Sequence, residues 1–274
     1  MTLKIDPQWR AALLARADQP PLRPRLPLLW QQHVIGSVEP DFFDPLISGQ
    51  PGVARALLES EHSESGLRWR LLGEATPALK ALAGALRELG VGRVRQHWRD
   101  EQLAVSDAQG QRIASVERGI CRPLGIATSA VHLVGCASDG RFWVQQRSLD
   151  KANEPGLWDT LMGGMVSAQD SVQSALARET WEEAGLRLDT LVELQRGGEV
   201  VLRKPSSDGA DAGYVVERVD WYRCTVPDGV QPLNQDGEVA QFALLEIADL
   251  IERLQRNEFT TEAALILADV LERV

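Results

Sequence analysis

Cysteine and histidine are scarce in this sequence. The 274 residues include only three cysteines (Cys121, Cys136 and Cys224) and four histidines, and no C-x-x-C pair occurs. An odd and widely spaced cysteine count argues against a disulfide framework. Without clustered thiols and imidazoles, the chain also does not look like a zinc protein. Both features fit a reducing compartment, and we expect the cytoplasm.

Long apolar runs are also missing. A helix that crosses a membrane needs about 18 or more consecutive apolar residues, and no segment of this sequence approaches that length. The first residues, MTLKIDP, have no apolar core of the signal-peptide type. We therefore expect no association with a membrane.

Positive charge is in deficit. Lys and Arg number 29 against 39 Asp and Glu, which gives a formal net charge of −10. A polyanion such as DNA would be repelled on average, so nucleic acid is not the expected partner. A small anionic substrate is still compatible, because a few local cations or a bound metal reverse the field within one cleft. With 44% hydrophobic and 25% charged residues the chain should fold into globular domains, as a monomer or a homodimer.

The first 120 residues predict a small α+β domain. Asp6 and Pro7 indicate the start of a helix, and the Pro- and Arg-rich stretch 19–29 predicts a loop. Further along, the pattern predicts a strand at 68–72, a helix from Thr76 to Gly90, and strands at 101–105 and 111–117.

Residues 121–274 predict a second domain of α/β type. Two strands, 126–137 and 141–147, flank a hairpin signal at Ser138-Asp139-Gly140. After a loop at 152–160 the pattern predicts a helix at about 171–184, strands near 190–202, 214–226 and 238–246, and helices near 247–256 and 261–272. The polar, Gly-rich stretch 203–213 predicts a mobile loop.

The predicted helix 171–184 has an unusual inward face. Val172, Leu176, Glu179 and Glu183 are spaced by 4, 3 and 4 residues and so share one stripe of the helix. Glu182 and Arg178 lie beside that stripe. The face thus begins with aliphatic side chains and ends in carboxylates.

Buried carboxylates need neutralisation, and two like charges at i and i+4 repel each other even when exposed. A divalent cation would resolve both problems, and hard oxygen ligands suit Mg²⁺ or Mn²⁺. Magnesium also binds substrate phosphates, so a diphosphate would share the cleft. The alternative is a solvated helix end in which Arg178 pairs with Glu182.

The segment from Gly164 to Leu186 resembles the signature of the Nudix hydrolase family, G-x5-E-x7-R-E-U-x-E-E-x-G-U, where U is a bulky aliphatic residue. The matching positions are Gly164, Arg178, Glu179, Glu182, Glu183, Gly185 and Leu186. Two positions depart from it. Asp170 stands where the first Glu is expected and is one methylene shorter, and Thr180 replaces the first aliphatic residue.

The resemblance implies an α/β/α sandwich with a mixed sheet, preceded here by the small N-terminal domain. It implies an enzyme that hydrolyses a diphosphate linkage in a small molecule. Magnesium would be held by Glu179, Glu182 and Glu183, joined by the backbone carbonyl of Gly164, while Arg178 orients the glutamates. The metal would draw charge from the phosphate and activate water.

Other candidates come from neighbouring segments. Glu238, in Asp236-Gly-Glu-Val239, is either an extra metal ligand or base, as in similar enzymes, or a turn residue. Arg147 and Lys151 follow a predicted strand toward the signature, where two cations would hold a diphosphate. We expect His132 to be a hydrogen-bonded core residue. The tryptophans Trp143, Trp158 and Trp181 are also expected in the core.

The whole chain resembles a subgroup of Nudix proteins with an extra N-terminal domain. The resemblance rests on Val116-Glu-Arg118, Leu124-Gly-Ile126, Leu161-Met-Gly-Gly-Met165 and Asp236-Gly-Glu-Val239. Fungal and plant relatives imply a phosphatase of thiamine diphosphate that prefers damaged forms. Because the N-terminal unit stands beside a complete catalytic domain, we also expect it to cover the substrate cleft or to contribute part of it. A nucleoside-diphosphate or nucleotide-sugar hydrolase is the first alternative. An isopentenyl-diphosphate isomerase would need a T-N-x-C motif, which this sequence does not contain. A non-enzymatic Nudix protein that only binds a ligand would tend to lose glutamates of the signature, whereas Glu179, Glu182 and Glu183 are present here.

Overall fold

The computed structural model describes residues 5–64, 66–151, 153–206 and 213–273. The first unit is built on a four-stranded sheet with strand order β2-β1-β4-β3. Its strands are β1 (Leu26–Trp30), β2 (His33–Val38), β3 (Leu58–Ser63) and β4 (Gly66–Leu71). The helices α2 (Asp44–Gly49), α3 (Pro51–Leu57) and α4 (Ala75–Leu89) pack with it around Phe43, Leu79 and Leu82. Short 3-10 and α segments, Val91–Arg93 and α5 (Val94–His97), follow.

The prediction of a loop over 19–29 was wrong at its C-terminal end. Residues from Leu26 onward form β1, which is an inner strand of the first sheet. The proline that suggested a loop is tolerated because β4 pairs with β1 only from Leu28 onward. On that side Pro27 therefore leaves no missing donor in the ladder.

The strand and helix signals elsewhere in this unit are confirmed. Strand β4 and helix α4 lie where the pattern placed them, and α4 ends at Gly90, whose φ of 69° is in the left-handed region that favours glycine. The predicted pair of strands is β5 (Gln102–Ser106) and β6 (Arg112–Glu117), which form a separate two-stranded sheet.

The second unit contains a seven-stranded mixed sheet. Its main path is β11-β12-β7-β8-β13, with β10 on β7 and β9 on β8. Strand β12 runs parallel to β7, whereas the other pairings are antiparallel. The bounds are β7 (Thr128–Cys136), β8 (Phe142–Arg147), β9 (Trp158–Asp159), β10 (Met162–Met165), β11 (Val192–Pro205), β12 (Tyr214–Thr225) and β13 (Val239–Leu245). In the stretch 203–213 expected to be a loop, residues 203–205 belong to β11, and 207–212 lie outside the described residues.

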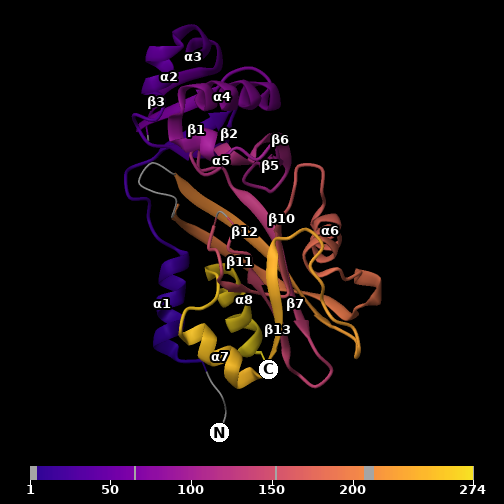
Figure 1. Ribbon diagram of the computed structural model, residues 1–274. Coiled ribbons are helices and arrows are strands. Elements are labelled where there is room, and N and C mark those ends of the chain that lie inside the picture. Colours follow the sequence, from indigo (N-terminus) through magenta and orange to yellow (C-terminus); the bar gives the residue numbers. More distant parts are fainter. Residues whose placement is uncertain (1–4, 65, 152, 207–212, 274) are drawn as a thin grey trace.

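Helices cover both faces of this sheet, as Figure 1 shows. Helix α6 (Val172–Ala184) covers one face around Leu133, Leu161 and Leu176. Helices α7 (Ile247–Gln255) and α8 (Thr261–Leu271) cover the other around Phe142 and Trp221. The α/β/α sandwich with a mixed sheet, preceded by an α/β region, is therefore confirmed.

Helix α1 (Pro7–Ala17) does not pack with the sheet that follows it in the chain. Asp6 caps its N-terminus by accepting from the Gln8 amide, with Pro7 at the first helical position. Leu13 and Ala17 then join the core of the second unit. Figure 1 shows α1 beside α7 and α8, at the far end from α2 to α4. A domain boundary at residue 120 stays a prediction. Helix α1 precedes that boundary in the sequence but packs in the core of the second unit.

The β5–β6 hairpin connects the two units. The Gln102 carbonyl accepts from the Ala168 amide at 2.7 Å, and Leu103 forms a β-bridge with Ser167. Arg112 donates to the carbonyl oxygens of Ala168 and Asp170. The hairpin therefore holds the loop that leads directly into helix α6.

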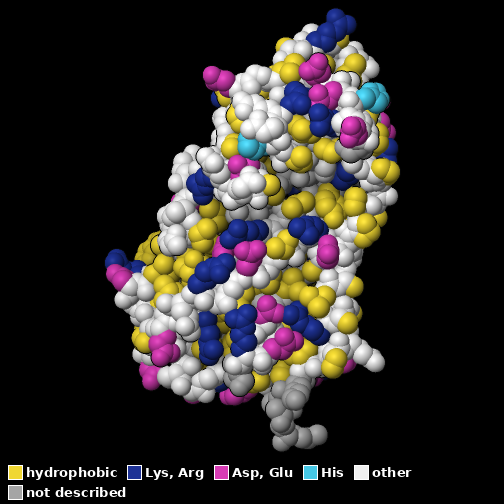
Figure 2. Space-filling model, turned by 180° about the vertical axis from the view of Figure 1, so that it is seen from behind, with side chains coloured by type: hydrophobic (Ala, Val, Ile, Leu, Met, Phe, Trp, Pro, Cys, Tyr) yellow, Lys and Arg dark blue, Asp and Glu magenta, His cyan; other side chains and the backbone are white. Residues whose placement is uncertain are grey.

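The surface has charges of both signs. On the face turned away in Figure 1, Lys and Arg side chains lie between Asp and Glu side chains, as Figure 2 shows. Across the described ranges, none of the helices combines the length and the apolar character that crossing a membrane requires.

The packing of α1 predicts opposite outcomes for two adjacent leucines. Leu13 is fully buried, whereas Leu14 is half exposed. Leu13→Ala should lower the free energy of unfolding by about 2–5 kcal/mol because it leaves a cavity under α8. Leu14→Ala, the matched control, should stay within about 0.5 kcal/mol in the same urea titration. Equal effects would contradict the packing of α1.

The three cysteines are free and buried, and burial raises the pKa of Cys121 and Cys224 to about 12. Thiolate is the reactive form, so these thiols should react slowly with a disulfide reagent at pH 8 in the folded protein. After unfolding in guanidinium chloride, all three should react at the rate of a free cysteine. Rapid reaction of the folded protein would refute this.

Candidate active site

Helix α6 is capped at both ends. The Ser171 hydroxyl accepts from the Ser174 amide at 3.0 Å, and Ser174 Oγ accepts from the Ser171 amide at 2.8 Å. At the other end Gly185 has φ 62°, and a Cβ there would lie 2.6 Å from the Leu233 carbonyl oxygen. Within these limits, Leu176 and Glu183 are buried and Val172 and Glu179 are partly buried. The aliphatic-to-acidic stripe thus faces inward, as predicted.

Arg178 lies at the centre of the carboxylates. Its Nε and Nη2 donate to Asp170 Oδ2 at 3.0 and 2.9 Å, and its Nη1 lies 2.9 Å from oxygens of both Glu179 and Glu182. Burial lowers the pKa of Arg178, but the three carboxylates outweigh it and the net pKa is raised. The Arg178–Glu182 pair considered as an alternative exists, yet it is one part of a larger network.

Asp170, although one methylene shorter than the glutamate of the family signature, reaches the Arg178 guanidinium. Besides both bonds from Arg178, it accepts from the hydroxyls of Ser167 and Ser174, each at 3.1 Å. Burial raises the pKa of Asp170, but these donors lower it more, so the net pKa lies below its usual range. The missing methylene is therefore compensated by the position of the loop, which the β5–β6 hairpin holds.

Glu183 is the most buried of the helix carboxylates, at 2% exposure. Its Oε2 accepts from Gln145 Nε2 at 2.7 Å and from the Gly163 amide at 3.0 Å. Lys151 Nζ lies 3.6 Å from its other oxygen. Burial raises the pKa of Glu183 despite Lys151 and these donors. Gln145 and Gly163 fix the side chain in one orientation.

Glu179 rests against the backbone of β10. A Cβ at Gly164 would lie 2.1 Å from Glu179 Cδ, so a larger residue at 164 would displace this carboxylate. Burial, and then the charges of Glu183 and Glu182, raise the pKa of Glu179 to about 7 against the opposing effect of Arg178. Glycine at this position allows the glutamate to approach the strand.

These side chains line a polar cleft of about 300 Å³. Glu179, Glu182, Glu183, Arg178 and Gly164 stand on one side of it. The structure brings the other predicted residues, Arg147, Lys151 and Glu238, to the same cleft. All eight candidate residues thus meet in one place.

The cations predicted to hold a diphosphate are engaged with the protein. Lys151 pairs with Glu238 and lies near Glu183, while Arg147 donates to the Asn153 carbonyl at 3.0 Å and lies 3.5 Å from Asp159. Glu238 is more than half exposed, on the turn before β13. Burial lowers the pKa of Lys151, partly offset by Glu183.

The donor set suits a hard divalent cation. Glu179, Glu182 and Glu183 supply carboxylate oxygens from one helix to one cleft, and Arg178 and Lys151 balance part of their charge. In the described part of the chain, no three Asp, Glu, His or Cys side chains stand close enough to enclose an ion as they are. Binding would therefore exchange the ion pairs with these two cations for bonds to the metal.

Several residues of the cleft were not identified from the sequence. Asp159 is buried between Arg147 and His132, and Gln145 orients Glu183. Neither belongs to a motif, and they gain a role because they are neighbours across the antiparallel β8–β9 pair. His132 is a hydrogen-bonded core residue, as expected, with Nδ1 2.9 Å from Thr160 Oγ1.

The tryptophan predictions were met in part. Trp158 is buried and Trp143 packs against the core beneath α6. Trp181, however, is 51% exposed, so its placement in the core was wrong. It follows Thr180, which is fully buried and donates to the Leu176 carbonyl at 2.6 Å. The helix thus turns Thr180 inward and its neighbour outward.

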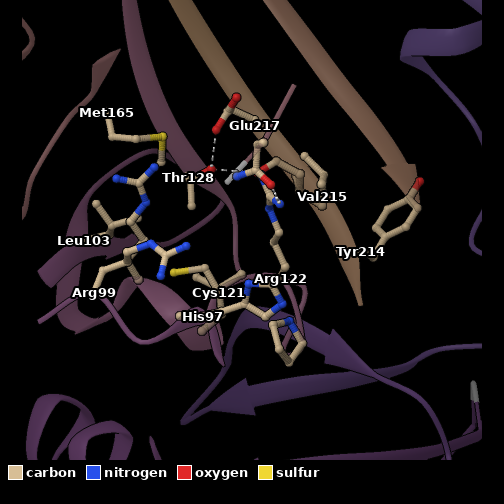
Figure 3. Close-up of a pocket in the computed structure, with 16 residues that line it drawn as sticks. His97, Arg99, Leu103, Cys121, Arg122, Thr128, Met165, Tyr214, Val215 and Glu217 are labelled. Atoms are coloured by element: carbon tan, nitrogen blue, oxygen red, sulfur yellow. Dashed lines mark hydrogen bonds between the residues drawn. The ribbon is translucent and has the colours of Figure 1, made fainter. Parts of the chain in front are cut away.

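A second pocket adjoins the cleft, at the junction of the two units. Figure 3 shows His97, Arg99 and Leu103 of the first unit, with Thr128, Val215 and Glu217 of the sheet. Five residues line both the pocket and the cleft: Arg118, Arg122, Asn153, Met165 and Glu217. The two spaces are therefore continuous.

Comparisons with known proteins agree with this geometry. The family model of the NUDIX domain matches residues 127–269, just over half of the chain. Nudix hydrolase 24, chloroplastic, of Arabidopsis thaliana is 27% identical over 220 residues, covering 74% of this chain and 56% of its own length. Protein YJR142W of Saccharomyces cerevisiae is 27% identical over 189 residues, covering 64% of this chain and 55% of its own.

A more distant relative is an isomerase rather than a hydrolase. Isopentenyl-diphosphate Delta-isomerase of Corynebacterium glutamicum (strain R) is 27% identical over 167 residues, covering 58% of this chain and 84% of its own length. This chain spans about half the length of the yeast and plant relatives. The family match covers the larger sheet, helix α6 and most of the residues that line the cleft, and the chain belongs to the Nudix family.

Proposed function

We propose that this protein hydrolyses a diphosphate linkage in a small molecule with the help of Mg²⁺, for which Mn²⁺ can substitute. One observation carries the proposal. Three carboxylates of α6 and two cations, Arg147 and Lys151, line the same cleft. Carboxylates suit the metal and cations suit the phosphate oxygens, so the two sets together fit a metal-bound diphosphate.

In this proposal, different residues of the cleft bind the metal and the diphosphate. Glu179, Glu182 and Glu183 hold the metal, together with the carbonyl of Gly164, and Arg178 keeps the first two glutamates in place. When bound, the metal withdraws charge from the phosphate and acidifies a water molecule. Lys151 and Arg147 bind the diphosphate oxygens. Glu238, at the exposed rim beside Lys151, assists by accepting the proton of the attacking water.

The N-terminal unit contributes part of the substrate cleft in this proposal. Glu101 and Arg118, joined by a 2.7 Å ion pair, line it from the first unit. The β5–β6 hairpin also holds the loop before α6 through Gln102 and Arg112. The first unit is thus in contact with both the cleft wall and the helix that carries the carboxylates.

Thiamine diphosphate, especially in oxidised forms, is the proposed substrate, with the monophosphate as product. The support is the likeness of 64% and 74% of this chain to a yeast protein and to a Nudix hydrolase of Arabidopsis thaliana, together with the motifs Val116-Glu-Arg118 and Asp236-Gly-Glu-Val239. Loss of substrate with and without Mg²⁺, followed by chromatography, should be compared over thiamine, nucleoside and nucleotide-sugar diphosphates, because a nucleotide sugar is cut into two monophosphates and releases no free phosphate. Faster turnover of a nucleotide or nucleotide sugar would replace thiamine diphosphate with that class.

Two other functions are less well supported. Isopentenyl-diphosphate isomerases are among the relatives, but the isomerase motif contains a cysteine, and no described cysteine lines the acidic cleft. A regulator that only binds its ligand has no need of three carboxylates facing the place of the metal. Incubation with isopentenyl diphosphate, followed by product analysis, separates isomerisation from hydrolysis.

Glu182→Gln should lower kcat by about 100-fold or more, because the amide keeps the size but removes a charge that holds the metal. Glu252→Gln is a matched control, since Glu252 also pairs with an arginine four residues away on an exposed helix face. Both variants should unfold at the wild-type temperature. Near-normal turnover of Glu182→Gln would contradict the proposed site.

Asp170→Asn should weaken Mn²⁺ binding by about 10–100-fold in calorimetry, because Arg178 loses its charged partner and no longer fixes Glu179 and Glu182. Asp170→Glu, which restores the family residue, should bind Mn²⁺ as tightly as wild type. Equal affinities for the Asn variant and wild type would show that Arg178 is held without Asp170.

A further inference from the structure

The pocket at the junction of the two units has an apolar body and a polar edge. Leu103, Ile126, Met165 and Val215 supply apolar surface. On the side of the pocket away from Leu103 and Met165, Figure 3 shows Thr128, Glu217 and Arg122 close together, beside Val215. Such a combination of flat apolar walls and a few polar groups is typical of sites for small organic rings.

The polar edge combines donors and acceptors. Thr128 Oγ1 donates to Glu217 Oε2 at 3.1 Å, and the two residues are direct neighbours across the parallel β7–β12 pair. Arg122 Nη1 donates to Asn153 Oδ1 at 3.3 Å. Burial raises the pKa of the Glu217 carboxyl, with Glu262 adding to the effect and Arg122 opposing it. The Glu217 carboxyl presents acceptor oxygens next to the Arg122 guanidinium, which only donates.

That pair of groups matches a particular ring edge. In an amino-substituted nitrogen heterocycle, the amino group donates and the adjacent ring nitrogen accepts. A carboxylate that accepts from the amino group, beside a guanidinium that donates to the ring nitrogen, complements this edge with two hydrogen bonds. A ring with a carbonyl and an N–H at the same positions turns an acceptor toward the carboxylate and a donor toward the guanidinium, so neither bond forms.

The pocket is placed to act on the same molecule as the metal cleft. Its own volume is about 70 Å³, so a ring seated there extends into the cleft. Met165 lines both spaces, and its carbonyl accepts from Arg178 at 3.3 Å. Asn153, which also lines both, follows Lys151 in the chain and contacts Arg147 through its carbonyl. A ring and a diphosphate can therefore be held at once.

We propose that this junction pocket is the subsite for the organic part of the substrate. It takes a nitrogen heterocycle with an amino group beside a ring nitrogen, recognised by Glu217 with Thr128 and Arg122. The inference rests on the proposed hydrolase function and names its substrate class. His97, Arg99 and Leu103 make the N-terminal unit a wall of this subsite, so the unit contributes to specificity.

Cytidine and uridine diphosphate test this edge, because their bases differ in the amino-against-carbonyl pattern and their sugars and phosphates are the same. Wild type should show a KM about 10-fold lower for cytidine diphosphate, as expected of a paired hydrogen-bonding edge. Glu217→Leu should erase that preference by raising the cytidine diphosphate KM, with kcat within about twofold. Glu217→Gln, whose amide oxygen can still accept from the amino group, should keep part of it.

Glu199→Leu, on the outer strand β11 and paired with Arg218, is the matched control and should leave the preference unchanged. If Glu217→Leu does not fold, Thr128→Val serves instead, because it removes the hydroxyl that holds Glu217, and the preference should shrink. An unchanged preference in the variant that folds overturns the subsite.

Failure of the hydrolase proposal gives a different result. In that case wild type releases no phosphate from any diphosphate in Mg²⁺. Binding of the unphosphorylated probes thiamine, cytidine and uridine, measured by calorimetry, then tests the pocket alone. Tighter binding of thiamine and cytidine than of uridine, lost in Glu217→Leu, would support the subsite. Equal binding of the three would overturn it.

Discussion

The arrangement of the cleft depends on three carboxylates that lie close together at the C-terminal end of helix α6. Glu179, Glu182 and Glu183 lie within two turns of α6, and two of them are largely buried. Two unit charges 4 Å apart repel each other by about 4 kcal/mol when the effective dielectric constant is about 20. A fold gains nothing from such repulsion unless cations are held nearby. The surroundings of α6 supply them.

Arg178 and Lys151 balance this charge from opposite sides. Arg178 lies on the helix itself and is bonded to Asp170, while Lys151 reaches in from the loop after β8. Each pairs with two carboxylates of the cleft, so neither holds a single fixed partner. A bound divalent ion would supply positive charge to the carboxylates in place of Arg178 and Lys151, and a diphosphate would supply negative charge to these two cations. The charge of the cleft is thus only partly balanced without ligands, and its ion pairs can be exchanged for bonds to them.

The two units share this charged site through the β5–β6 hairpin. Gln102 and Leu103 extend a short strand onto the loop at 167–168, and Arg112 binds the carbonyl of Asp170. Asp170 in turn fixes Arg178. The first unit is therefore connected by hydrogen bonds to Asp170 and, through it, to Arg178, which positions the glutamates. This explains in physical terms how an added domain can influence a complete catalytic one.

The sequence predicted what depends on local spacing. Helix α6, its caps and its acidic face follow from a 3.6-residue period and from Ser171 and Gly185, and most strands of the larger sheet follow from hydrophobic patterning. It did not predict β1, because the Pro- and Arg-rich composition of residues 19–29 favours a loop. It also did not predict that α1 packs on α8. Gln145, Asp159 and Glu217 gain their roles only when distant strands come together, and no local pattern marks them.

The most direct test of the account is a crystal of the protein soaked in Mn²⁺, with an anomalous difference map calculated at the manganese edge. The account predicts a strong peak in contact with carboxylate oxygens of Glu179, Glu182 and Glu183, with Arg178 and Lys151 turned from their present partners. A manganese peak elsewhere, with these glutamates still paired to the two cations, would contradict it.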